Sequence, residues 1–131
     1  MSNAKVRYPD MRRGVALAVE RLADPEYQRR VWVERTYPSP NYYDDLSMTI
    51  HTLYDDTGIA TDVQREIGAT LLNEREATLV QEVVRALDDV LAEVGDQAPD
   101  EAILNSDRWP RVVAAAKEAW REMSMKLPTG E

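Results

Sequence analysis

His51 is the only histidine in the chain, and two aspartates stand at helical spacings from it. Asp44 lies seven positions before His51 and Asp55 four positions after it, so on one continuous helix the three side chains would share a face. A histidine and carboxylates in this arrangement can ligate a divalent metal or act as an acid–base pair. A metal-assisted hydrolase that uses Asp44, His51 and Asp55 is therefore one hypothesis, although a site of this kind usually needs three or four ligands and only one here is histidine.

Other catalytic signatures are missing from the sequence. Without cysteine there is no thiolate metal site and no cysteine nucleophile. Gly-x-Ser-x-Gly, Gly-x-Gly-x-x-Gly and Gly-Lys-Ser/Thr do not occur. Acidic pairs such as Asp88–Asp89 point about 100° apart on a helix, so they favour solubility rather than shared acid–base catalysis. We therefore expect no cofactor and favour a protein that is not an enzyme.

Aromatic residues crowd one short stretch around the prolines at positions 38 and 40. Tyr and Arg, which are interleaved there, often carry the binding energy of protein interfaces. The candidate binding residues are Arg29, Trp32, Tyr37, Tyr42 and Tyr43. The alternative is that a protein with no Phe builds its core from Tyr and Trp. That alternative fits Tyr27, Trp32 and Tyr43 better than Tyr37 and Tyr42, so the sequence leaves both interpretations open.

The composition restricts the class of partner. The chain has 131 residues, a net charge of −8 and 31% charged residues, with basic residues concentrated before position 41 and acidic residues after it. An acidic total argues against nucleic acids or anionic membranes as the main partner. No apolar run approaches the roughly 20 residues of a membrane span, and the N-terminus lacks the apolar core of a secretory signal. We expect a cytoplasmic protein, and Ser2-Asn3-Ala4 is either native or the remnant of a tag.

The hydrophobic pattern predicts an all-α fold, because no segment alternates like a strand. Two prolines make 36–40 a loop. The predicted N-caps are Asp10, Asp24, Asn41, Thr61 with Gln64, Asn73 with Glu76, and Ser106 or Asp107. Gly58 is a predicted left-handed C-cap, and Gly95 is predicted to close its helix at the C′ position. The expected helices cover about 11–23, 25–34, 42–56, 62–71, 74–94, 99–104 and 107–126. Together they form a compact bundle of five to seven helices around the helix near 74–94, in one domain spanning 10–126 with flexible tails at 1–9 and 127–131.

Part of this pattern is similar to a known family. The carrying segments are Gly-Ala-Thr-Leu-Leu-Asn-Glu-Arg-Glu-Ala at 68–77, the Val-rich run from Val80 to Gly95, Ala-Pro-Asp at 98–100, and Trp-Pro-Arg-Val-Val-Ala-Ala-Ala at 109–116. They resemble small helical proteins of Streptomyces and related actinobacteria that have no assigned function. The resemblance covers about 10–125, and it implies an all-α fold and a bacterial cytosolic protein. It transfers no catalytic residue and no cofactor.

The leading hypothesis is a non-enzymatic interaction module, an accessory or immunity-like protein, that binds another protein. The alternatives are the metal-assisted hydrolase and a self-associating structural protein whose aromatic residues form a dimer interface. The expected partner is thus a protein or a second copy of the chain.

Overall fold

The computed structural model describes residues 6–95 and 97–125, and in this part of the chain it contains helices and no strand. The elements are α1 (Pro9–Leu22), α2 (Pro25–Tyr27), the π-helical η1 (Gln28–Val33), α3 (Leu46–His51), the π-helical η2 (Thr52–Asp56), the 3-10 turn η3 (Val63–Glu66), α4 (Glu74–Val94), α5 (Asp100–Leu104) and α6 (Trp109–Ser124). The predicted all-α bundle is confirmed. Not one of the described helices is both long and apolar enough to cross a membrane.

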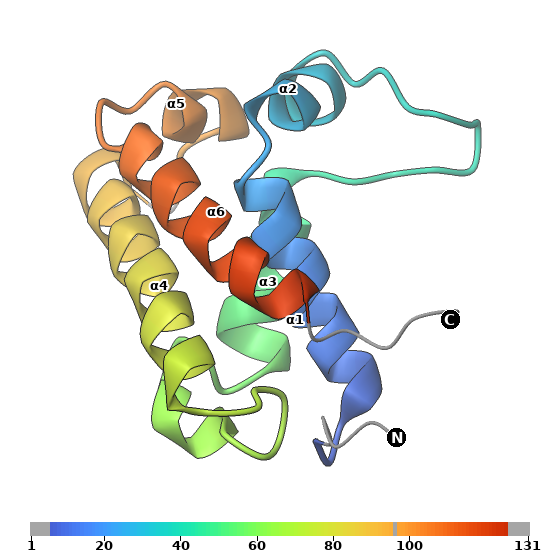
Figure 1. Ribbon diagram of the computed structural model, residues 1–131. Helices are drawn as coiled ribbons and strands as arrows, with labels where there is room; N and C mark the ends of the chain where they lie inside the picture. The colour runs from blue at the N-terminus through green and yellow to red at the C-terminus, as the bar shows by residue number, and fades with distance from the viewer. Residues whose placement is uncertain (1–5, 96, 126–131) are drawn as a thin grey trace.

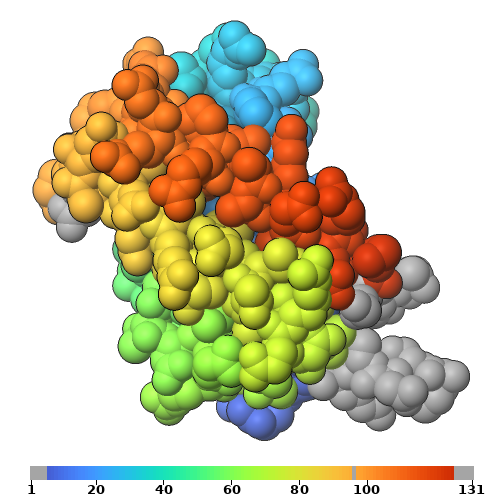
Figure 2. Space-filling view, turned by 60° about the vertical axis from the view of Figure 1, so that its left-hand side comes forward, coloured from blue at the N-terminus to red at the C-terminus, as the bar shows by residue number. Residues whose placement is uncertain are grey.

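The central helix α4 has the predicted bounds because local chemistry fixes both of its ends. The Asn73 side chain accepts the backbone N–H of Glu76 at 3.0 Å, and Gly95 follows the last turn with a φ of 91°. The buried face of α4 packs mainly against α6, and the two helices run side by side in both views (Figures 1 and 2). Its core residues include Val80, Val83, Val84, Leu87 and Val90.

A buried ion pair joins α1 to the start of α4. The Arg12 guanidinium donates to both carboxylate oxygens of Glu76 at 2.7 Å, and Arg12 also donates to the Thr70 carbonyl at 3.0 Å. The Glu76 carboxylate accepts the Leu72 N–H at 2.8 Å as well. The reciprocal capping box at Asn73 is therefore only half formed, because Glu76 is committed to Arg12 and Leu72.

The predicted helix over 42–56 is wrong at its start. The helix begins at Leu46, because the Asp45 side chain accepts the Met48 N–H at 2.9 Å and caps the chain there, in place of Asn41. The helix also changes character, since its second half, η2, is π-helical and ends at an extended Thr57. Gly58 is not a left-handed cap, because the described glycines with positive φ are Gly68 and Gly95.

Several other predicted ends move by a few residues. Thr61 and Gln64 form no cap, and the predicted helix over 62–71 is reduced to the 3-10 turn η3, which contains Gln64. Helix α1 begins at Pro9, and Asp10 pairs with Arg13 instead of capping it. At the start of α6 neither Ser106 nor Asp107 is the N-cap, which is Arg108.

Residues 6–9 of the predicted N-terminal tail belong to the described part of the chain. The backbone N–H groups of Arg7 and Tyr8 donate to the carbonyls of Gly68 and Ala69 at 2.9 Å, so the chain is tied to the bundle before the predicted start of the domain at residue 10. Residues 1–5, the predicted last helical residue Lys126 and the predicted tail 127–131 lie outside the described residues.

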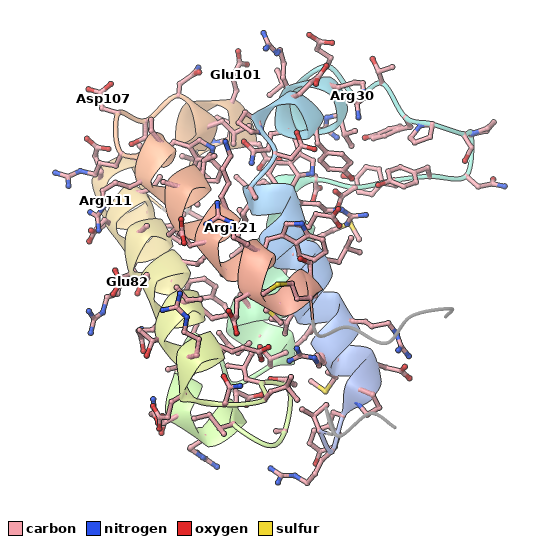
Figure 3. The ribbon with its side chains drawn as sticks, viewed as in Figure 1. Arg30, Glu82, Glu101, Asp107, Arg111 and Arg121 are labelled. Carbon is pink, nitrogen blue, oxygen red and sulfur yellow. The ribbon has the colours of Figure 1, made fainter. Side chains whose placement is uncertain are left out.

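The surface of the bundle is polar, whereas one loop stands away from it. The charged side chains of Glu82 and Arg111 point outward from α4 and α6, and that of Asp107 points outward from the turn before α6 (Figure 3). The connection between η1 and α3 extends well beyond the helical body (Figure 1). This segment contains the predicted loop over 36–40, which is confirmed, together with residues 41–45, which the sequence had assigned to a helix.

Candidate functional site

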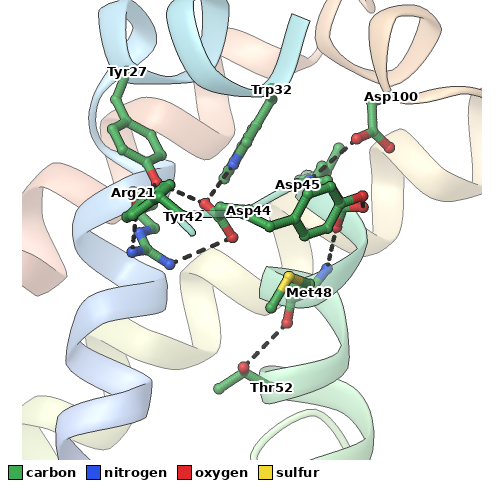
Figure 4. A network of polar contacts seen from close by, with 11 residues as sticks. Arg21, Tyr27, Trp32, Tyr42, Asp44, Asp45, Met48, Thr52 and Asp100 are labelled. Atoms are coloured by element: carbon green, nitrogen blue, oxygen red, sulfur yellow. Dashed lines mark hydrogen bonds and ion pairs between the residues drawn. The ribbon is translucent and has the colours of Figure 1, made fainter. Parts of the chain in front are cut away.

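The most unusual side chain at the base of the projecting loop is Asp44, a carboxylate with only 1% of its surface exposed. Its Oδ2 atom accepts the indole N–H of Trp32 at 2.7 Å and the hydroxyl of Tyr27 at 2.7 Å. Arg21 Nη1 lies 3.4 Å from the other oxygen, Oδ1 (Figure 4). A buried carboxylate is tolerated only when donors and a cation surround it. Here the carboxylate comes from one end of the loop, and the cation and the donors come from α1, α2 and η1.

The hydrogen bonds form a directed chain that ends at Asp44. The Tyr27 hydroxyl donates its proton to Asp44, so in its contact with the Tyr42 hydroxyl, at 2.5 Å, Tyr42 is the donor. The Tyr42 oxygen in turn accepts from Arg21 at 3.0 Å. Burial, followed by the hydrogen bonds to Tyr42 and Asp44, raises the pKa of Tyr27 far above its ordinary value. The phenol therefore stays protonated and remains a donor throughout the physiological pH range. We call Arg21, Tyr27, Trp32, Tyr42 and Asp44 the anchor network.

The loop beyond the anchor network carries a cluster of tyrosines. The Tyr37 ring lies 6.1 Å from the Tyr42 ring and 5.8 Å from the Tyr43 ring, measured between centroids. Tyr43 is 54% exposed, and its hydroxyl donates to Asp45 at 2.6 Å. The loop begins at Arg35, a non-glycine residue with a φ of 61°, which is a strained conformation that its surroundings must maintain.

The structure separates the predicted binding residues into three environments. Trp32 is 1% exposed and belongs to the core, so it cannot touch a partner directly. All three tyrosines lie in the projecting loop: Tyr37 and Tyr42 are half-buried, with Tyr42 part of the anchor network, and Tyr43 is exposed. Arg29 is exposed but lines a separate hollow with Val33, Glu101 and Leu104. The residues therefore do not form one surface, and Tyr37 and Tyr43 are the pair that the loop presents together.

The predicted metal ligands are not brought together either. His51 and Asp55 do form the expected pair on consecutive helical turns. Asp44, however, precedes α3, because Asp45 is the N-cap, and so it does not share a helix face with them. Within residues 6–95 and 97–125 no group of three or more His, Asp or Glu side chains is arranged to hold a metal ion.

Sequence reasoning missed Arg21 as a functional residue, and it gave Asp44 only the role of a metal ligand. Arg21 occupies the last turn of α1, where a cation is already explained by the helix dipole. One signal was available for Asp44: a carboxylate directly before the capping Asp45, in a stretch rich in hydroxyl and indole donors.

A hollow of about 270 Å³ lies beside Asp44, between α1 and α3. Small side chains on both helices leave this space, and Arg21 and Asp44 line one end of it. The Asp44 Oδ1 atom is buried and accepts no hydrogen bond from the described residues. The anchor network thus holds the loop through Oδ2, while the enclosed Oδ1 has only the Arg21 guanidinium beside it, at 3.4 Å.

Comparison with known proteins assigns the chain to a family but not to a function. No curated protein and no solved structure was found to match it. Residues 6–127 match a family described as a domain of unknown function, DUF7945, and the chain therefore belongs to that family.

Proposed function

We propose that the protein is a protein-binding module whose recognition element is the projecting loop from Arg35 to Tyr43. The observation that carries this proposal is the anchoring of an exposed aromatic loop by a buried carboxylate. Asp44 fixes one end of the loop to Trp32 and Tyr27, while Tyr43 remains 54% exposed farther along. Loops positioned by a rigid scaffold are frequent sites of binding.

The chemistry of the loop suits recognition of a protein. Tyr side chains bring large contact areas with few rotatable bonds, so they lose little entropy on binding. Pro38 and Pro40 restrict the backbone further, and a loop that is already ordered loses less freedom when a partner docks. Tyr37, packed against both neighbouring tyrosines, supports the exposed ring of Tyr43.

We also propose that the protein is an accessory, immunity-like domain of the bacterial cytoplasm and has no catalytic activity. The acidic net charge of −8 favours a protein partner over nucleic acid or an anionic membrane. A second copy of the chain is the other partner that the loop could serve.

The test compares the half-buried Tyr37 and the exposed Tyr43 of the loop with an exposed tyrosine elsewhere. In the variant Tyr37→Ala/Tyr43→Ala we expect the fold to be retained, by circular dichroism and thermal unfolding, and the partner captured from a bacterial lysate to be lost. Tyr8→Ala is the matched control, because Tyr8 is 51% exposed but lies outside the loop. Capture that survives in the loop variant would refute the proposal, as would equal loss in the Tyr8→Ala control.

Light scattering on the same samples identifies the kind of partner. A dimeric wild type that becomes monomeric in the loop variant would make the partner a second copy of the chain. A monomeric wild type that captures a stoichiometric protein through the loop would make the partner a different protein.

A further inference from the structure

We infer that the hollow between α1 and α3 is a binding site for an alkylammonium group, with Asp44 Oδ1 as its principal acceptor. The site is separate from the recognition loop, because Gly14, Leu17 and Ala18 of α1 form one wall and Met48, Thr49 and Thr52 form the other. It shares only Asp44 and Arg21 with the anchor network. The inference therefore does not depend on the protein-binding role of the loop.

The strongest observation is the state of the Asp44 carboxylate. The side chain is 1% exposed, yet only Oδ2 accepts hydrogen bonds, from Trp32 and Tyr27. Oδ1 accepts none from the described residues, and Arg21 Nη1 at 3.4 Å supplies charge without hydrogen-bond geometry. Buried carboxylate oxygens are normally satisfied by donors, so an N–H group entering the hollow would meet an acceptor that has none.

The charges around the hollow favour a cation. Arg21 balances Asp44, whereas Asp56 in the opposite wall has no ion-pair partner within the described part of the chain. His51, which also lines the space, is paired with Asp55. Asp56 is thus the acidic side chain of this lining that remains uncompensated, and its charge favours a cationic ligand over an anionic one.

The size and lining of the space favour an ammonium group on a short alkyl chain. A volume of about 270 Å³ is slightly smaller than typical drug-sized pockets. Leu17 and Met48, 42% and 48% exposed, form an apolar rim for methylene groups. The Thr52 hydroxyl donates to the Met48 carbonyl at 3.1 Å, which leaves its oxygen free to accept a second ammonium N–H, and Figure 4 shows Thr52 and Met48 in line below Asp44.

Such a group has two sources, a free small amine or the lysine side chain of another protein. The probes are therefore n-butylammonium chloride and the peptide acetyl-Gly-Lys-Gly-amide, with n-butanol as the neutral control of the same shape. Binding is followed by proton–nitrogen NMR on the indole N–H of Trp32, which donates to Asp44 and reports directly on this carboxylate. The Trp32 signal is assigned from its disappearance in Trp32→Phe.

We expect n-butylammonium to shift the Trp32 signal saturably, with a Kd on the order of millimolar, and n-butanol to leave it unmoved at equal ionic strength. Tighter binding of the free amine would identify small amines as the natural source, and tighter binding of the peptide would identify a lysine side chain. No saturable shift up to about 100 mM of either probe would overturn the inference, because millimolar binding would be complete there.

Charge variants separate this site from general attraction to an acidic protein. Asp56→Asn should weaken n-butylammonium binding by roughly threefold, whereas Asp107→Asn, an exposed acid away from the hollow, should not change it. Arg21→Gln should strengthen binding, because Asp44 then loses its internal cation. Equal effects of the Asp56 and Asp107 substitutions would refute a defined site. If Arg21→Gln does not fold, the comparison of Asp56→Asn with Asp107→Asn decides alone.

Discussion

The Asp44 carboxylate accepts the indole N–H of Trp32 at 2.7 Å, so a residue at the end of the projecting loop is held by a tryptophan inside the core. Tyr27 donates to the same oxygen at 2.7 Å. The two donors come from one continuous helical stretch before the loop, while the acceptor comes from the end of the loop. These hydrogen bonds set the geometry of the loop, because they join the segment before it to the residue that ends it.

The first test removes the carboxylate at this base. Asp44→Ala leaves the Tyr27 hydroxyl, the Trp32 indole and Arg21 without their acceptor, and we expect a loss of about 3–5 kcal/mol in unfolding free energy. Asp44→Asn keeps an acceptor oxygen and should cost less, about 1–2 kcal/mol. Urea unfolding measures both. Asp45→Asn is the control, since Asn caps a helix as well as Asp does, and a cost for this control equal to that of Asp44→Ala would contradict the anchoring role.

The second test concerns the buried pair between α1 and α4. Glu76→Gln leaves the Arg12 guanidinium buried without a counter-charge, and we expect about 3–5 kcal/mol of destabilisation. The double variant Arg12→Met/Glu76→Leu leaves no buried charge unpaired and should recover part of this loss, reduced by the hydrogen bonds that the Leu72 N–H and the Thr70 carbonyl lose. Denaturant unfolding of the single and double variants checks this. A double variant less stable than Glu76→Gln would show that the pair itself stabilises the fold.

The third test uses two glycines for which we expect effects of opposite sign. Gly95 has a φ of 91° and a ψ of 139°, a region that only glycine adopts readily, so Gly95→Ala should cost about 1–3 kcal/mol although nothing lies within 4 Å of the added carbon. Gly14 lies inside α1, and an added Cβ would meet Thr52 Cγ2 at an ordinary 4.0 Å. Gly14→Ala should therefore stabilise the protein by about 0.5–1 kcal/mol. Thermal unfolding shows the sign of each change.

The fourth test is the alkaline limit of stability. Burial, followed by hydrogen bonds to acidic or phenolic partners, raises the pKa of Tyr27 and Tyr54 well above the ordinary value of 10.0. Above pH 10 the unfolded chain releases these protons and the folded chain retains them, so unfolding becomes steadily more favourable. The stabilising contribution is complete below pH 10 and declines above it. Tyr54→Phe should make the decline shallower, and an unchanged slope of unfolding free energy against pH would contradict this assignment.

Elements whose ends are set by neighbouring residues could be predicted from the amino-acid sequence. Helix α4 has its predicted bounds because the Asn73 cap and the terminal Gly95 act within a few residues. The Asp24 side chain accepts the Tyr27 N–H at 3.0 Å and starts the second helical segment as predicted, for the same reason. The hydrophobic period of α4 and α6 then determined which faces are buried and hence the all-α bundle.

The environment of the polar and aromatic residues depends on contacts that form only in the folded chain. The sequence placed Tyr42, Tyr43 and Asp44 on one helix, but Asp44 is drawn into contacts with Trp32 and Arg21, twelve or more positions away, and the helix begins after it. Because Asp44 closes the loop in this way, Trp32 is buried in the core and Tyr43 is exposed on the surface. Such contacts between distant segments leave no periodic trace in the sequence, because their energy comes from burying a charge among donors that only the folded chain assembles.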